Sequence, residues 1–362
     1  MITNRERERQ TLDFEKPEGR GSVQETFFPW SITIERFVEE GLPIEIANGV
    51  LDIINDMDGN EAGQEETYLQ VKWGEGVMEY EEYLGFDSVR RIHFALPFFQ
   101  SVIRGWEDWE ALKKRGDREL EKYFTDEQIE KAYGHLKSGH DKGDYSIRLH
   151  LEGFFWVPRE LMGIEEHLFA FYDEPELLHD MSNYMLKVYQ NQLMKVIKVV
   201  QPDMVYILED LSGVDGPMIS PEYFDEFIGA YYKELFPLFK KAGVRHVIVD
   251  TDGDFEKLIP NFIEAGAEGF LPMDVNAGMD IVEIRKKYPK LKFVGSYNKL
   301  EISKGKGAID KEFERLLPVI RQGGFIPAAD HQIAPCTSLE NYRYYIAKLK
   351  EVMKQAGADI MA

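Results

Sequence analysis

The fold is decided by two similar stretches, Met204-Val205-Tyr206-Ile207-Leu208-Glu209-Asp210 and His246-Val247-Ile248-Val249-Asp250-Thr251-Asp252. Each is a short apolar run that ends in carboxylates, which is typical of a buried strand with polar residues at its carboxyl end. Between them, residues 221–241 predict a helix, because Ser220 is a candidate N-cap and Pro221 suits the first turn. Since two parallel strands need such a crossover, these residues predict a βαβ unit.

The same alternation of strand and helix continues on both sides of this unit. We expect further strands at 86–96, 146–151, 269–273, 292–296 and 324–327, a strand candidate at 23–30, and helices after Pro175 and at 281–287 and 339–355. This succession suits a (β/α)8 TIM barrel of the α/β class. A doubly wound open sheet is the structural alternative, but no G-x-G-x-x-G motif follows a strand.

The chain shows no composition break that demands a second domain. We therefore expect one domain over residues 1–362, with a helical and irregular part at 1–140 and regular βα units at 141–362. The start of the chain, residues 3–9, predicts an exposed helix with Thr3 at its beginning.

Composition excludes several classes of function. The 362 residues include 43 Lys and Arg against 65 Asp and Glu, a net charge of −22, which argues against binding to nucleic acid or to anionic lipid. The single cysteine, Cys336, excludes a disulfide framework. No signal-like segment or run of about 18 apolar residues is present, so we expect a soluble cytoplasmic protein and leave open whether it is a homo-oligomer.

Polar residues follow most of the predicted strands. In a parallel barrel the carboxyl ends of all strands open on one rim, and that rim carries the active site. We therefore expect a shared mouth lined by Glu209, Asp210, Asp250, Asp252, Asp274, Tyr297, Asn298, Asp330 and His331. So many carboxylates require either a bound cation or protonation of some of them. The alternative is that several only cap the helices that follow.

Aromatic residues near predicted loops form a second group. Phe28, Trp30, Phe155 and Trp156 would supply an apolar wall for a flat substrate if they face the mouth, and core packing is the alternative for each.

The sequence resembles the uroporphyrinogen decarboxylase superfamily, and within it the corrinoid-linked methyltransferase branch. The resemblance runs nearly end to end and is densest after residue 200. It rests on the order of short motifs, among them Asn4-Arg5-Glu6-Arg7, Phe14-Glu15-Lys16-Pro17, Ser220-Pro221-Glu222-Tyr223-Phe224, Asp252-Gly253-Asp254, Gly278-Met279-Asp280 and Gly323-Gly324-Phe325-Ile326-Pro327. It implies a barrel with the site in its mouth.

The resemblance also implies which residues act. Thiol-methylating members of the branch look as if they hold zinc through His and Cys positions that fall here on Asp250, Asp252 and His331. None of the three is the family residue. Oxygen and nitrogen donors suit a zinc ion that polarises an oxygen, so zinc is a candidate ion. The alternative is that these residues act without a metal, as an acid that protonates a leaving oxygen.

The resulting hypothesis is demethylation of a small methylated substrate, for which a methoxylated aromatic is one candidate. Asp250, Asp252 and His331, supported by Glu209 or Asp210, would bind a metal or donate a proton to the leaving oxygen. The Asp-x-His-x-x-Gly corrinoid motif is absent from the sequence, so the corrinoid would be carried by a separate corrinoid-binding protein. A carboxy-lyase with Asp250 or Asp252 as the acid and Tyr297 as an orienting donor is the alternative enzyme, and a non-catalytic barrel is the third.

Overall fold

The computed structural model describes the backbone of residues 2–58, 69–70, 75–96 and 102–361. Its main sheet contains seven parallel strands that neighbour one another in chain order. They are β2 (Val89–Phe94), β3 (Ser146–Glu152), β4 (Met204–Leu208), β7 (His246–Asp250), β8 (Gly269–Leu271), β9 (Lys292–Tyr297) and β10 (Phe325–Ala329). The short β1 (Leu69–Gln70) pairs antiparallel with β2, and β5 (Ser212–Gly213) and β6 (Gly216–Pro217) form a separate hairpin.

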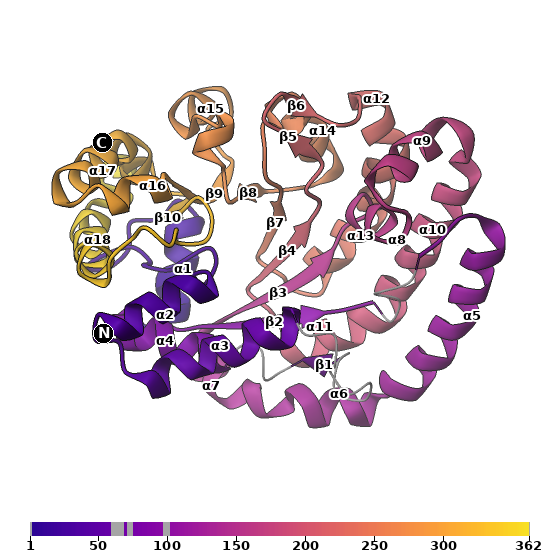
Figure 1. Cartoon of the computed structure of the whole chain (residues 1–362), viewed down its shortest axis with the longest axis horizontal. Coiled ribbons are helices and arrows are strands. Elements are labelled where there is room, and N and C mark those ends of the chain that lie inside the picture. Colours follow the sequence, from indigo (N-terminus) through magenta and orange to yellow (C-terminus); the bar gives the residue numbers. More distant parts are fainter. Residues whose placement is uncertain (1, 59–68, 71–74, 97–101, 362) are drawn as a thin grey trace.

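Helices precede, connect and follow the parallel strands, and Figure 1 shows them surrounding the sheet. Before β2 lie α1 (Asn4–Leu12), α2 (Ser31–Glu39), α3 (Ile44–Asp58) and α4 (Glu75–Leu84). Between β2 and β4 lie α5 (Trp106–Tyr123), α6 (Asp126–Tyr133), α7 (Lys137–Lys142), α8 (Trp156–Met162), α9 (Ile164–Asp173), α10 (Pro175–Val188) and α11 (Met194–Val200). The remainder are α12 (Pro221–Phe224), α13 (Ala230–Lys241), α14 (Ile259–Ala265), α15 (Ile281–Lys287), α16 (Lys299–Ser303), α17 (Lys306–Gln322) and α18 (Leu339–Val352).

The predicted barrel-like α/β fold is confirmed, with one change in how the barrel closes. Seven strands are parallel, and the expected strand at 23–30 does not form. Instead, the segment 21–28 fills the seam between β10 and β2. Thr26 Oγ1 donates to the Ala329 carbonyl at 3.0 Å, and Arg91 Nη2 donates to the Glu25 carbonyl at 3.1 Å. The segment thus contacts β10 and β2 through side chains, where a strand would use a main-chain ladder.

The inside of the barrel is filled by side chains from alternate positions along the strands. A buried cluster contains Met204 and Tyr206 of β4, Ile248 of β7, Leu271 of β8, Val294 of β9 and Ile326 of β10. Leu12 of α1 belongs to the same cluster and is fully buried. The barrel interior is therefore apolar along β4 to β10, whereas the buried Arg91 of β2 and Arg148 of β3 lie at the level of Met204.

The first helix corrects a prediction. Thr3 caps α1 as expected, because its side chain accepts from the Glu6 N–H. The helix is not exposed, however. Glu8, Thr11 and Leu12 are buried, and the Thr11 carbonyl accepts from the Gly324 N–H, directly before β10. Helix α1 closes the amino-terminal end of the barrel, so its polar composition reflects contacts with strand ends and not solvent alone.

Two other helices differ from the prediction in detail. The stretches after Pro175 and from Pro221 to Lys241 are interrupted by π turns at Tyr189–Leu193 and Asp225–Gly229. Nowhere in the described parts of the chain does a helix combine the length and the apolar character needed to cross a membrane.

Candidate active site

Three carboxylates meet where β4 and β7 end. Asp250 is the last residue of β7 and is 4% exposed. The Asp252 N–H donates to Asp210 Oδ1 at 3.1 Å, which ties the loop after β7 to the loop after β4. Burial raises the pKa of Asp250 well above its ordinary range, and the charges of Asp210 and Asp252 raise it further. Burial and the two neighbouring charges therefore favour the acid form of the Asp250 carboxyl group.

Asp210 is held in this cluster by its backbone. Its φ of 41° is unusual for a residue with a side chain, and its carbonyl accepts from Arg159 Nη1 at 2.7 Å. Burial raises the pKa of Asp210, and the nearby Asp252 carboxylate adds to the rise. A strained conformation that brings one carboxylate toward two others is the kind of arrangement that functional sites retain.

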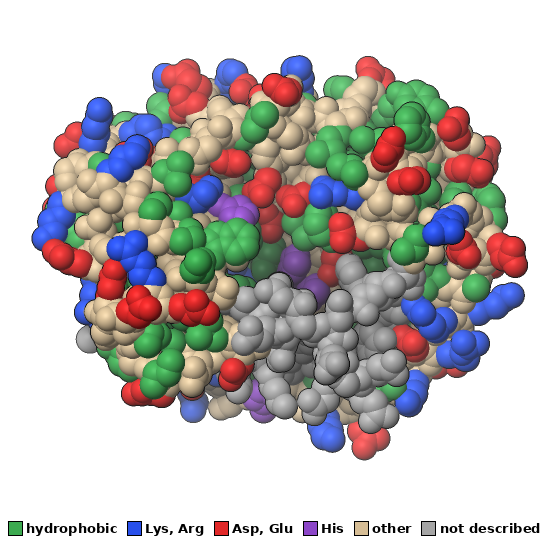
Figure 2. Space-filling view, in the orientation of Figure 1, with side chains coloured by type: hydrophobic (Ala, Val, Ile, Leu, Met, Phe, Trp, Pro, Cys, Tyr) green, Lys and Arg blue, Asp and Glu red, His purple; other side chains and the backbone are tan. Residues whose placement is uncertain are grey.

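His331 and aromatic rings form the neighbouring wall. His331 Nε2 lies 3.4 Å from Asp252 Oδ2. The Trp30 ring stacks on the imidazole with centroids 6.2 Å apart, and the Phe27 ring tilts against it at 5.3 Å. Trp30 is 48% exposed, so it offers one ring face to a ligand or to solvent. Figure 2 shows acidic side chains and histidines gathered in a hollow in the middle of the face it presents.

Deeper in the barrel lies a group that the sequence analysis did not single out: His93 of β2, His150 and Glu152 of β3, and Tyr206 of β4. The His150 ring stacks between His93 and Tyr206, each 4.7 Å away, and His93 hydrogen-bonds Glu152. Both ring nitrogens of His150 lack a hydrogen-bond partner within the described structure. Burial and the nearby His93 lower the pKa of His150 well below its ordinary value, so this imidazole is neutral.

A signal for this group was present in the sequence. Arg148, His150 and Glu152 alternate along β3, and residues two apart on a strand share a face. With Ser146 they make one face of β3 wholly polar while the other face is apolar, which indicates that the polar face meets other polar groups inside the barrel.

Glu209 lies next to Asp210 in sequence but does not share its surroundings. It is fully buried beneath α8, where its carboxylate accepts the N–H groups of Phe154, Phe155 and Trp156 at 2.8–3.1 Å. The Tyr232 hydroxyl donates to the same group. Burial raises the pKa of Glu209 to about 7, while these donors act in the opposite direction. Glu209 holds the start of α8, the helix that follows β3, and not a helix that follows its own strand.

Other predicted site residues also face neighbouring elements. Tyr297 is fully buried against Phe313 and Tyr345, and its hydroxyl donates to the Ile309 carbonyl. The Asn298 side chain caps α16. Phe155 packs on His167 and Phe171.

The last two predicted aromatic site residues, Phe28 and Trp156, differ in burial. Phe28 is buried in the main hydrophobic core, with 9% of its surface exposed. Trp156 is half-buried, and the Arg159 guanidinium lies 4.7 Å above its ring.

The two remaining acids at the rim have structural partners. Asp330 is fully buried, and its carboxylate accepts the N–H groups of Val275 and Lys299 and also the Lys299 ammonium, at 3.0–3.4 Å. Asp274 caps the turn that follows β8 by accepting the Asn276 N–H. Both therefore order the loops around the mouth.

Asp250, Asp252 and His331 are the candidate zinc ligands. In the part of the chain that the structure describes, no three His, Cys, Asp or Glu side chains are grouped so that they could hold a metal ion. Asp252 and His331 approach each other, but Asp250 does not complete a set of ligands with them. The arrangement does not fit a three-residue zinc site, and the function proposed below takes no step through a metal.

The fold and this site together define an α/β barrel with an acid-lined mouth. Residues 93–352 match the family model described as uroporphyrinogen decarboxylase (URO-D). Because the match covers more than half of the 362 residues, the chain belongs to this family. The resemblance seen in the sequence is thereby confirmed at the family level.

Solved structures extend the comparison to the whole chain. A methyltransferase from Methanosarcina mazei is similar with a TM-score of 0.62 and 14% identity, covering 97% of this chain and 99% of that chain. At this identity the likeness concerns the fold. A putative vitamin-B12 independent methionine synthase from Listeria monocytogenes matches with a TM-score of 0.43 and 11% identity over 95% and 98% of the two chains. Among the curated proteins none matches significantly.

Proposed function

We propose that this chain transfers a methyl group from a small methylated substrate to a corrinoid carried by a separate protein. Its membership of the URO-D family and its fold likeness to a methanogen methyltransferase support the proposal. The single observation that carries it is the position of Asp250, a buried carboxyl group beside Asp210 and Asp252 whose pKa is raised by these surroundings.

The proposed reaction breaks the bond between the methyl carbon and an oxygen of the substrate. The bonding electrons remain with that oxygen, which needs a proton as it leaves. Asp250 is the candidate donor of that proton, because burial and two carboxylate neighbours disfavour its charged form and raise its pKa. A reduced corrinoid supplies, when bound, the nucleophile that accepts the methyl group.

The surrounding residues position the substrate. Phe27 and Trp30, stacked on His331, offer a flat apolar surface beside the acid. Deeper in the barrel, His150 stacks between His93 of β2 and Tyr206 of β4, and its two ring nitrogens have no hydrogen-bond partner among the described residues. A buried neutral imidazole can donate one hydrogen bond and accept another, which suits a substrate with a hydroxyl or ether oxygen.

The experiment is an anaerobic spectrum. Purified protein is mixed with chemically reduced cob(I)alamin and a panel of methoxyaromatics and methylamines, and loss of the Co(I) band is followed with growth of methylcobalamin. The proposal expects a change that depends on one donor class and disappears in Asp250→Asn. The matched control is Asp274→Asn, since an asparagine still caps the turn after β8.

A carboxy-lyase is the alternative enzyme, and an assay of carbon dioxide release with the same variant tests it. An acid such as Asp250 could also protonate the carbanion left by loss of carbon dioxide. Release of carbon dioxide from small carboxylated substrates without any corrinoid, abolished by Asp250→Asn, would contradict methyl transfer and favour this alternative.

A further inference from the structure

A second candidate binding site lies between α4 and α18, away from the barrel mouth. A cavity of about 460 Å³ is lined by Tyr83, Leu84, Arg343, Ile346, Ala347 and Lys350. This volume falls within the range of small-molecule sites. The cavity adjoins Gly85, which precedes β2, so it lies toward the amino-terminal ends of the strands.

The two cations of this cavity form no hydrogen bond or ion pair with any described residue. Arg343 and Lys350 thus carry unpaired charges, although the protein has a net charge of −22. Asp87, the acid whose charge acts on Lys350, is already engaged by Arg7 and Arg20. Positive charge is therefore in local excess in an acidic protein.

The Lys350 ammonium group lies within this excess of positive charge. A Cβ at Gly85 would collide with its ammonium group, so the side chain lies close to the backbone at the end of α4. Burial lowers the pKa of Lys350, and the charge of Arg20 lowers it further. An anion bound beside the ammonium would relieve both unfavourable effects.

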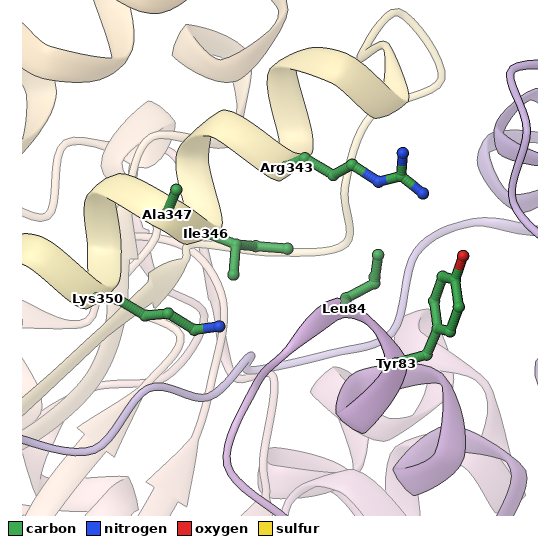
Figure 3. A pocket seen from close by; sticks show the side chains of 6 residues that line it. All are labelled: Tyr83, Leu84, Arg343, Ile346, Ala347 and Lys350. Carbon is green, nitrogen blue, oxygen red and sulfur yellow. The ribbon is translucent and has the colours of Figure 1, made fainter.

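The spacing of the two cations describes the ligand. Arg343 and Lys350 lie seven residues apart on α18, which separates their Cα atoms by about 10.5 Å along the helix. Figure 3 shows Leu84 and Ile346 between the two charged side chains, with Tyr83 beside Arg343. The cavity thus has a cation at each end and apolar side chains in the middle.

We propose that this cavity binds a small dianion whose two acidic groups are joined by an apolar chain, as in an α,ω-dicarboxylate. One carboxylate pairs with the Arg343 guanidinium and the other with the Lys350 ammonium, while the chain covers Leu84 and Ile346. The site is independent of the proposed methyl transfer, since it shares no residue with the barrel mouth.

The test compares three probes of equal length by calorimetric titration: suberate with two carboxylates, octanoate with one, and 1,8-octanediol with none. We expect saturable binding of suberate, about tenfold weaker binding of octanoate, and none of the diol, since a hydrogen bond to a charged group is worth about 1.5–3 kcal/mol. Lys350→Met and Arg343→Met each weaken suberate binding about tenfold.

Lys354→Met is the matched control, because Lys354 is exposed one turn beyond Lys350 and does not line the cavity. It leaves suberate binding unchanged, and suberate raises the melting temperature of this control as it does that of the wild type. Absence of saturable suberate binding, equal binding of the diol, or an equal loss in Lys354→Met would overturn the proposal.

Discussion

Asp250 is the residue on which the proposed chemistry depends, and its protonation predicts a pH profile. The acid form is the active form, and its pKa is raised. The rate of methyl transfer is therefore constant at low pH and falls as pH rises through that pKa. Asp250→Asn should lower the rate about 10²–10⁴-fold, the usual contribution of a general acid. Single-turnover spectra with cob(I)alamin between pH 5 and 9 measure both effects.

A neighbouring substitution checks the cause of this profile. Asp252→Asn removes one of the two negative charges that raise the pKa of Asp250. Asp250 then loses its proton at a lower pH, so the rate of methyl transfer begins to fall at a lower pH than in the wild type. A rate that is independent of pH, or a fall that begins at the same pH in Asp252→Asn, would show that Asp250 is not the proton donor.

Single residues also show how far a sequence can predict a site. The rule that strand ends line the mouth applies equally to Glu209 and Asp210, yet the two diverge. Glu209 lies under α8 as a helix cap, and Asp210 turns toward Asp252 with a positive φ. The direction of a side chain at a strand end depends on the backbone of the turn, which residue type alone does not determine.

At the scale of elements, the start of α8 depends on Gly153. A Cβ at this position would lie only 2.1 Å from the Glu209 carboxyl carbon, which is fixed by three backbone N–H groups. Gly153→Ala should therefore destabilise the protein by about 1–3 kcal/mol, the usual cost of overpacking. Urea denaturation measures it. Gly307→Ala is the control, because nothing lies within 4 Å of its added Cβ, and a loss no larger than in this control would contradict the prediction.

The seam between β10 and β2 depends on a buried acid. Glu25 Oε2 accepts the Ala329 N–H at 3.0 Å, and burial raises the pKa of Glu25 to about 8 from 4.5. Folding therefore takes up a proton between these two pH values. The free energy of unfolding contributed by this group is largest below pH 4.5 and falls by about 1.4 kcal/mol per pH unit up to pH 8.

Glu25→Gln removes this dependence, because the amide is neutral at every pH and still offers an oxygen to Ala329. We expect the variant to gain stability relative to the wild type as pH rises from 5 to 8, with no further gain above. Urea denaturation at several pH values measures the difference. Glu39→Gln, an exposed control, shows no such trend. A difference between Glu25→Gln and wild type that stays constant with pH would refute the prediction.

Local patterns predicted the regular elements well and the seam poorly. The strand at 204–208 and the helix at 281–287 have the predicted bounds, because apolar runs and periodicity are properties of a few consecutive residues. The seam instead joins Glu25 and Thr26 to Ala329, more than 300 residues away in sequence. The residues of segment 21–28 resemble those of a strand, but the segment contacts its neighbours through side chains and forms no main-chain ladder with them.

At the scale of the whole molecule, the same limit explains α1. Its composition, Asn4-Arg5-Glu6-Arg7-Glu8-Arg9, is that of a solvated helix. Its charges instead find partners at strand ends: Arg5 pairs with Asp203 before β4, and Glu8 accepts from Ser146 of β3. Which charged face is buried depends on contacts between elements that are distant in sequence, so composition could not reveal it.

If α1 is part of the barrel core, truncating the side chain that it contributes to that core should destabilise the whole fold. Leu12 is fully buried among side chains of five strands. Leu12→Ala leaves a cavity there and should lower the free energy of unfolding by about 2–5 kcal/mol. Because that cavity lies inside the barrel, the loss should appear in a single cooperative transition monitored by both tryptophan fluorescence and circular dichroism. Leu300→Ala is the control, since Leu300 is 39% exposed and its truncation should cost far less. An equal cost in both variants, or a separate early transition in Leu12→Ala, would mean that α1 folds apart from the barrel and only rests on it.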